Sequence, residues 1–91
     1  MADFPKREND YHQSGLQFVN TELDTGLTFA RIALGSKTRA KIERNRVNAR
    51  KAYNSALHFL AETSLNAEES RRVKEKFAAL KSNLERLGEK F

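Results

Sequence analysis

The sequence has 91 residues, with 17 Lys or Arg against 12 Asp or Glu and no cysteine. A chain of this length forms one domain with a thin core, and the lack of cysteine excludes disulfides and thiolate metal sites. No apolar run reaches the ~20 residues of a membrane-spanning helix, and the opening MADFPKREND has no apolar signal region, so we expect a cytoplasmic protein without a membrane segment.

The composition favours helices, because good helix formers dominate and only one proline and four glycines occur. We therefore predict an all-α fold, an antiparallel up-down-up three-helix bundle over residues 14–91. Residues 1–13 show no apolar period, so we expect a flexible N-terminal arm there.

The first predicted helix covers residues 15–34. Ser14 and Gln17 fit a capping box at its start, and Gly35 can take the left-handed conformation that ends a helix. One face repeats every three or four residues: Leu16, Val19, Leu23, Leu27, Ala30 and Leu34. Gly26 lies inside this helix, where it either allows another helix to come close or is simply tolerated.

The second predicted helix covers residues 37–63, after a cap at Ser36 or Thr38. Its apolar stripe is wide enough to contact two helices, which indicates the central helix of the bundle. The stripe consists of Ile42, Ala49, Ala52, Tyr53, Ala56, Phe59 and Leu60. Asn45 lies on the same line, either as a buried polar group or where the stripe reaches solvent, and we favour solvent.

The third predicted helix covers residues 67–87. Asn66 and Glu69 have the spacing of a capping box, and Gly88 is placed to stop the helix. Apolar residues repeat by four and three between these ends: Val73, Phe77, Leu80, Leu84 and Leu87. Both links are short, so consecutive helices should be antiparallel neighbours.

A second apolar face of the first helix predicts a protein interface. Phe18, Phe29 and Ile32 fall together, roughly opposite the leucine-rich face. The expected partner is a second copy, in a homo-oligomer such as a homodimer, or another helical protein. The alternatives are that Phe4 or Tyr11 of the arm covers the patch, or that these are ordinary exposed apolar residues.

Positive charge is concentrated in residues 37–51, which hold seven basic residues and one acid. Four of them form a possible anion-binding face: Lys37, Lys41, Arg44 and Lys51. Such a face can bind nucleic acid or another polyanion, although an ordinary solvated helix surface is the interpretation we prefer. No aromatic side chain is interleaved for base stacking, and no helix-turn-helix follows.

The sequence predicts no catalytic or metal site. His12 and His58 lie far apart, and no histidine has a second ligand at metal-binding spacing. The adjacent Glu68 and Glu69 are explained by the helix start, and no glycine-rich phosphate loop occurs. We therefore expect no enzyme activity, no cofactor and no small-molecule substrate.

Ala49, Tyr53, Ala56 and Leu57, in the stretch NARKAYNSALHFL, resemble the second helix of a tetratricopeptide repeat. The stretch is similar as well to a helix of the small three-helix trafficking modules of the MIT type. The preceding residues lack the Trp-Leu-Gly-Tyr series of the repeat, and no proline ends the helix. The resemblance implies a helical protein-interaction module and transfers no binding residue.

These observations predict a non-catalytic helical interaction module that self-associates through its first helix. Nucleic-acid or polyanion binding through the second helix is the alternative.

Overall fold

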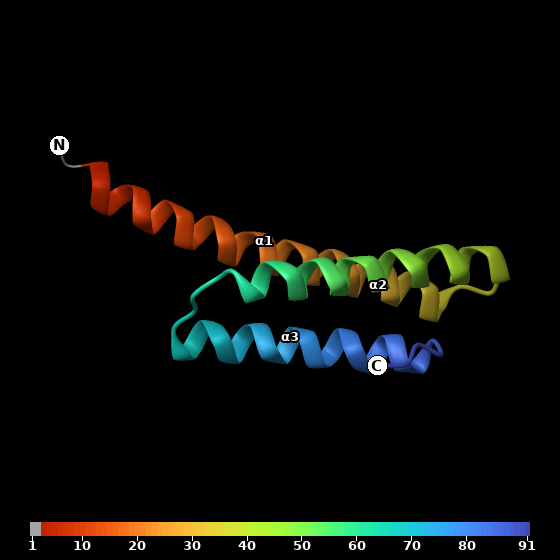
Figure 1. The fold of residues 1–91 in the computed structure, drawn as a ribbon. Helices are drawn as coiled ribbons and strands as arrows, with labels where there is room; N and C mark the ends of the chain where they lie inside the picture. Colours follow the sequence, from red (N-terminus) through yellow and green to blue (C-terminus); the bar gives the residue numbers. More distant parts are fainter. Residues whose placement is uncertain (1–2) are drawn as a thin grey trace.

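The computed structural model describes the backbone of residues 3–91 and the side chains of residues 15–91. These residues form three α-helices and no strand: α1 (Asp3–Gly35), α2 (Arg39–Ala61) and α3 (Ala67–Arg86). The chain reverses direction at residues 36–38 and again at residues 62–66, so the helices run up, down and up (Figure 1). The predicted all-α three-helix bundle is confirmed.

The helix α1 begins well before the predicted position. We expected an arm over residues 1–13 and a helix from residue 15, but the helix starts at Asp3 and Ser14 lies in its interior rather than at a cap. A missing apolar period means only that a segment has no core to pack against, and it does not end a helix. Pro5 lies in the first turn, where the amide that it lacks has no helical acceptor.

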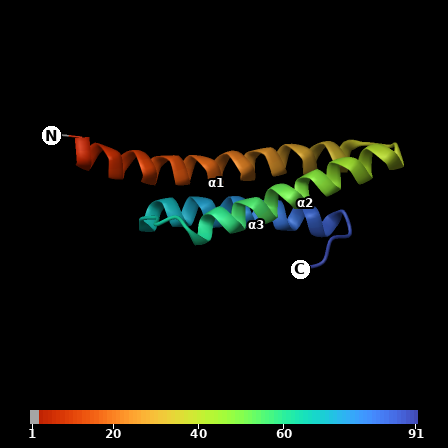
Figure 2. The ribbon, with the colours of Figure 1, turned by 45° about the horizontal axis from the view of Figure 1, so that its top comes forward.

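The early start makes α1 project beyond the bundle. At 1.5 Å per residue its 33 residues span about 50 Å, whereas the 23 residues of α2 span about 35 Å. The first turns of α1 extend past the ends of α2 and α3 in both ribbon views (Figures 1 and 2), and the molecule measures 57 × 21 × 17 Å. The first turns of α1 therefore lie beyond the ends of the other two helices.

The central helix is α1, whereas the sequence predicted α2. The helix α1 packs along α2 and also against α3, whereas α2 and α3 contact each other over only a few residues. The buried residues of α2 form one narrow row, Asn45, Ala49, Ala52 and Ala56, and Ala52 of this row lies against Gly26 of α1. The wide apolar stripe of α2 overstated its burial, because several of its larger side chains are only half-buried.

Gly26 allows the three helices to meet. A Cβ atom at this position would lie 2.7 Å from Cδ2 of Leu80 in α3 and 3.2 Å from the Cβ of Ala52 in α2. Of the two interpretations of Gly26, close approach is therefore correct. Around it lies a core of small and branched side chains: Val19, Leu23, Ala30, Ala33, Ala49, Ala52, Ala56, Val73, Leu80 and Leu84.

Asn45 corrects a further expectation, because it is buried rather than at the solvent edge. Its side chain is only 7% exposed, and its Nδ2 donates a hydrogen bond to the carbonyl oxygen of Lys41 at 2.8 Å. A bond to the preceding turn satisfies an amide without help from another helix. The helix thus tolerates a polar side chain in its buried row.

The ends of α3 confirm the sequence prediction, and the end of α1 does not. Asn66 accepts from the Glu69 amide at 2.8 Å, while Glu69 accepts from the Asn66 amide at 3.0 Å. Gly88 has φ 96°, but Gly35 is not left-handed. At the end of α1, Ser36 instead closes the turn, since its hydroxyl donates to the Ile32 carbonyl at 2.8 Å.

Candidate interaction surfaces

One face of α1 stays exposed in the bundle. Its residues are exposed and follow one another at helical spacing, and we call this set the open face: Phe18, Thr21, Thr25, Thr28 and Ile32. Phe18 is 55% exposed and Ile32 is 45% exposed. Two large apolar side chains are thus in contact with water along one side of the bundle.

The predicted group of Phe18, Phe29 and Ile32 is split by the fold. Phe29 is half-buried and packs against the core, so it borders the open face without belonging to it. Phe18 stacks on Phe59 of α2, with ring centroids 5.1 Å apart and an interplanar angle of 27°. Sequence reasoning assigned Phe59 to the core stripe and missed this pair, because no local pattern links residues on different helices.

The open face carries no charge between its two apolar ends. The side chain of Thr28 donates from Oγ1 to the Asp24 carbonyl at 2.9 Å, which satisfies its hydroxyl within the helix. Asp24 lies beside this face and pairs with Lys76 of α3 at 2.9 Å. A partner could cover the open face without burying an ionised group.

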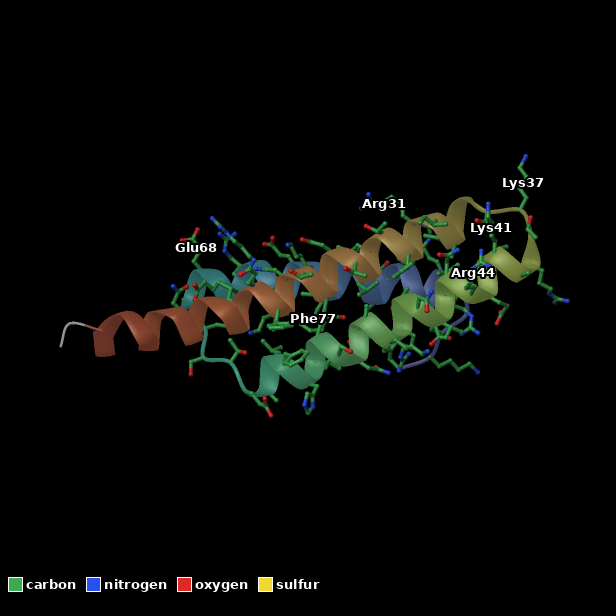
Figure 3. All side chains as sticks on the ribbon, turned by 90° about the horizontal axis from the view of Figure 1, so that it is seen from above. Arg31, Lys37, Lys41, Arg44, Glu68 and Phe77 are labelled. Atoms are coloured by element: carbon green, nitrogen blue, oxygen red, sulfur yellow. The ribbon has the colours of Figure 1, made fainter. Side chains whose placement is uncertain are left out.

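Basic side chains gather at the opposite end of the molecule from the projecting turns. Figure 3 shows Arg31, Lys37, Lys41 and Arg44 at the end where α1 stops and α2 begins, and we call this set the basic end. Among the described residues no carboxylate pairs with any of the four, and the first turn of α2 contains no acid. Sequence reasoning missed Arg31, although the three-residue link requires these helix ends to adjoin.

Only two of the four residues predicted to bind anions lie together on the first turns of α2. Lys37 lies in the link before α2, because the helix starts at Arg39 with Thr38 as its N-cap, so helical spacing does not fix its position. Lys41 and Arg44 are exposed on the first turns of α2. Lys51 is exposed too, but it lies two turns further along the helix than Arg44 and apart from the basic end.

Two basic residues within positions 37–51 form ion pairs inside the protein. Arg46 forms an ion pair with Glu89, whose side chain is only 15% exposed, and Arg50 pairs with the same carboxylate at 3.3 Å. Arg50 further donates to the Lys90 carbonyl at 3.0 Å and lies 4.0 Å from the ring centre of Phe91. These contacts, which we call the C-terminal clasp, join the end of α3 to α2 where the two helices otherwise touch little.

The turn that places Glu89 in the clasp follows from the left-handed Gly88. The amide of Gly88 donates to the Glu85 carbonyl and the amide of Glu89 to the Leu84 carbonyl, each at 2.9 Å, which is the Schellman pattern. The chain then leaves α3 toward α2. Gly88 was predicted from sequence, but the role of Glu89 depends on α2 lying beside it.

Glu43 is a second carboxylate partner of Arg46. Its hydrogen bond from the Arg46 guanidinium, and the positive charge of that group, lower the pKa of Glu43, while the same hydrogen bond raises the pKa of Arg46. The Nη2 to Oε2 distance is 2.7 Å. Arg46 therefore lies between two carboxylates and is unavailable to an external anion.

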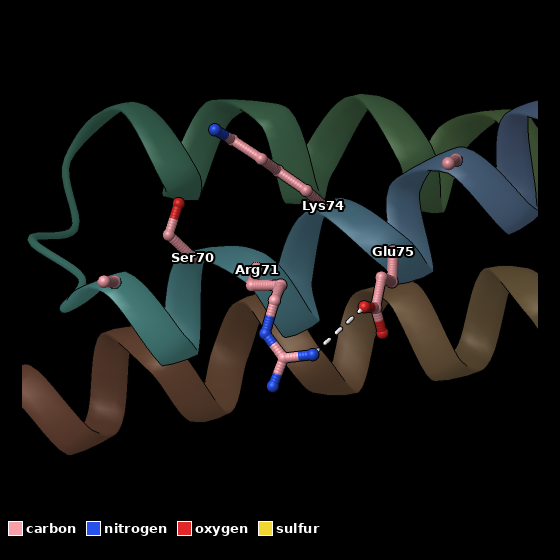
Figure 4. Close-up of a pocket in the computed structure, with 6 residues that line it drawn as sticks. Ser70, Arg71, Lys74 and Glu75 are labelled. Atoms are coloured by element: carbon pink, nitrogen blue, oxygen red, sulfur yellow. Dashed lines mark ion pairs between the residues drawn. The ribbon is translucent and has the colours of Figure 1, made fainter.

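One pocket among the described residues lies wholly on α3. The close-up in Figure 4 shows a shallow depression whose six lining residues all come from α3, crossed by an ion pair between Arg71 and Glu75 at 3.6 Å. Within residues 15–91, no three His, Asp or Glu side chains come together as metal ligands. His58 packs against the ring of Phe59, with centroids 5.7 Å apart.

Comparisons with protein-family models, with curated proteins and with solved structures found no match. The resemblance of residues 48–60 to a repeat helix therefore stays a prediction. Among the described helices, none has the length and apolar character needed to cross a membrane.

Proposed function

We propose that this protein is a non-catalytic interaction module that self-associates through the open face of α1. The observation that carries the proposal is the exposure of Phe18 and Ile32 at the two ends of a face without charges. Exposed apolar residues arranged along one helix are typical of a surface that packs on another helix.

The free energy available from burying Phe18 and Ile32 indicates that the interface is either weak or includes more residues. Burying a whole Phe or Ile side chain contributes about 1.5–3 kcal/mol, and Phe18 and Ile32 are about half exposed, so each can add roughly 1 kcal/mol. Four such side chains from two copies give about 4 kcal/mol, which only equals the lower bound on the cost of association. A stable complex must therefore include further residues of α1.

The test measures molar mass over a range of concentrations for the wild type and for two charged variants. Phe18→Asp should lower the mass to that of a monomer, because an uncompensated carboxylate would be buried at the contact. Leu57→Asp is the matched control, since Leu57 is 46% exposed on α2, outside the open face. A wild type that stays monomeric at millimolar concentration, or equal effects of the two variants, would refute the proposal.

Polyanion binding through the basic end is a second candidate function. The placement of Arg31, Lys41 and Arg44 toward one end of the molecule, without a carboxylate partner among the described residues, favours it (Figure 3). Binding of DNA or RNA should weaken as salt rises, and each lost phosphate contact should lower the salt slope by about 0.9. Lys41→Ala with Arg44→Ala should lower that slope, whereas Lys74→Ala on α3 should not. No binding at low salt would exclude this function.

The absence of catalysis, the absence of a cofactor and the cytoplasmic location stay predictions from the sequence. The interaction proposed above requires none of the three. It requires only that the open face meets a complementary surface.

A further inference from the structure

The open face continues a spacing of seven residues that runs the whole length of α1. The sequence has Phe4, Tyr11, Phe18, Thr25 and Ile32 at every seventh position, and the last three have described, exposed side chains. A step of seven residues returns to nearly the same side of a helix, which is the spacing that pairs helices in coiled coils. The uncharged strip on the bundle is thus one part of a longer helical seam.

The first turns of α1 extend past the ends of α2 and α3 in both ribbon views (Figures 1 and 2). At Gly15 an added Cβ would lie 2.9 Å from Oγ1 of Thr63, just after α2. The twelve residues before it, 3–14, form a helix that extends past that point (Figure 2). A helical segment of this length is marginal in water without packing, so a second surface alongside would stabilise it.

Charge decides between the two ways of pairing α1 with itself. A parallel pair would bring the basic ends of the two copies together. An antiparallel pair sets each basic end beside the first turns of the partner's α1. Those turns contain three acids and two basic residues in residues 3–14. Like charges opposed across an interface are costly, and opposite ones favour the register.

We propose that two copies of this chain pair antiparallel along α1, with the twofold axis close to Phe18. This inference rests on the proposed self-association and specifies its geometry. Phe18 lies fourteen positions from both Phe4 and Ile32, so an axis there sets these two opposite each other and Thr25 opposite Tyr11. Each projecting segment then lies on the open face of the partner, which supplies the additional contacts that Phe18 and Ile32 alone do not provide.

Disulfide trapping tests this geometry cleanly, because the natural chain contains no cysteine. Arg7→Cys and Thr28→Cys are made separately, mixed and oxidised. The antiparallel seam places position 7 of one copy near position 28 of the other, so the mixed cross-link should dominate over both self-cross-links. Lys74→Cys on the outer side of α3, mixed with Arg7→Cys, is the matched control and should give no specific product.

The outcomes separate the geometry from the proposed function. A dimeric mass with a dominant cross-link between two Thr28→Cys chains would overturn the antiparallel arrangement in favour of a parallel one, and self-association would stand. A dimeric mass without either cross-link would show that another surface is used. A monomeric mass would overturn both proposals.

A charge scan in the full chain gives an independent measurement. Tyr11→Asp should raise the dissociation constant of the dimer by about tenfold or more, which corresponds to about 1.4 kcal/mol or more. Gln13→Asp adds the same charge to the same segment but away from the seven-residue spacing, so it should have a much smaller effect. Equal effects of the two substitutions would contradict the seam.

Discussion

Replacing Gly26 with alanine adds one methyl group at the point where all three helices meet. That methyl would lie 2.7 Å from Cδ2 of Leu80 and 3.2 Å from the Cβ of Ala52. Leu80 is fully buried and cannot move its side chain into solvent, and the Cβ of Ala52 moves only with the backbone of α2. The helices must therefore separate by some tenths of an ångström or repack.

The magnitude follows from two opposing contributions. Alanine is favoured over glycine inside a helix by about 1 kcal/mol. Adding a methylene to a packed core costs about 1–3 kcal/mol. We therefore expect Gly26→Ala to lower the free energy of unfolding by about 1 kcal/mol, which is the steric cost less the propensity gain.

Urea unfolding followed by circular dichroism, at one protein concentration, measures this change. Gly35→Ala is the matched control, because Gly35 ends α1, has no neighbour within 4 Å and is not left-handed. It should be neutral or gain up to about 1 kcal/mol, so Gly26→Ala should be less stable than Gly35→Ala by about 1–2 kcal/mol. If Gly26→Ala were as stable as Gly35→Ala, the close approach of the helices would be wrong.

Three further predictions test the core, the caps and the clasp, and a fourth concerns pH. Leu84→Ala should cost about 2–5 kcal/mol of unfolding free energy, because the side chain is fully buried. Asn66→Ala removes the capping box and should cost about 1 kcal/mol. Both are measured by urea unfolding, and losses below about 0.5 kcal/mol would contradict the burial and the cap. Glu89→Gln removes the charge shared by two arginines of α2 and should destabilise the protein by about 1 kcal/mol, less in high salt; a loss independent of salt would contradict an ionic clasp. Folding lowers the pKa of Glu43, so its ionised carboxylate adds a small stabilisation of the folded state above the ordinary carboxylate pKa. That stabilisation is lost as the pH falls through the lowered pKa. Glu43→Gln should abolish that part of the acid destabilisation, and an unchanged pH profile would contradict it.

Local patterns were sufficient to identify the helices of this protein and several of their ends. The apolar period of Val73, Leu80 and Leu84 predicted the buried side of α3, and all three are buried. Asn66 and Gly88 have the cap roles that their residue types and spacing indicate. These features depend on hydrogen bonds and side chains within one or two turns, which is the range that a sequence pattern describes.

The candidate surfaces were only partly predictable. Phe18 and Ile32 are exposed on one face as the sequence suggested, but Phe29 packs against the edge of the core. The charge run did not reveal that Arg46 and Arg50 are held by Glu89, some forty positions later in the chain. Nor did it reveal Arg31, which joins the basic end only because α1 and α2 turn back on each other.

The sequence by itself determined that three segments form helices, which face of each helix is mainly buried, and how α3 starts and ends. Only the tertiary structure decided that α1 is central and that Asn45 is buried. It decided as well which cations stay open to a partner. The physical reason is that apolar periodicity shows which side chains are buried. Which helix they pack against depends on residues distant in the chain. Gly26 shows the difference, because its missing Cβ has a meaning only once Leu80 and Ala52 have been brought against it.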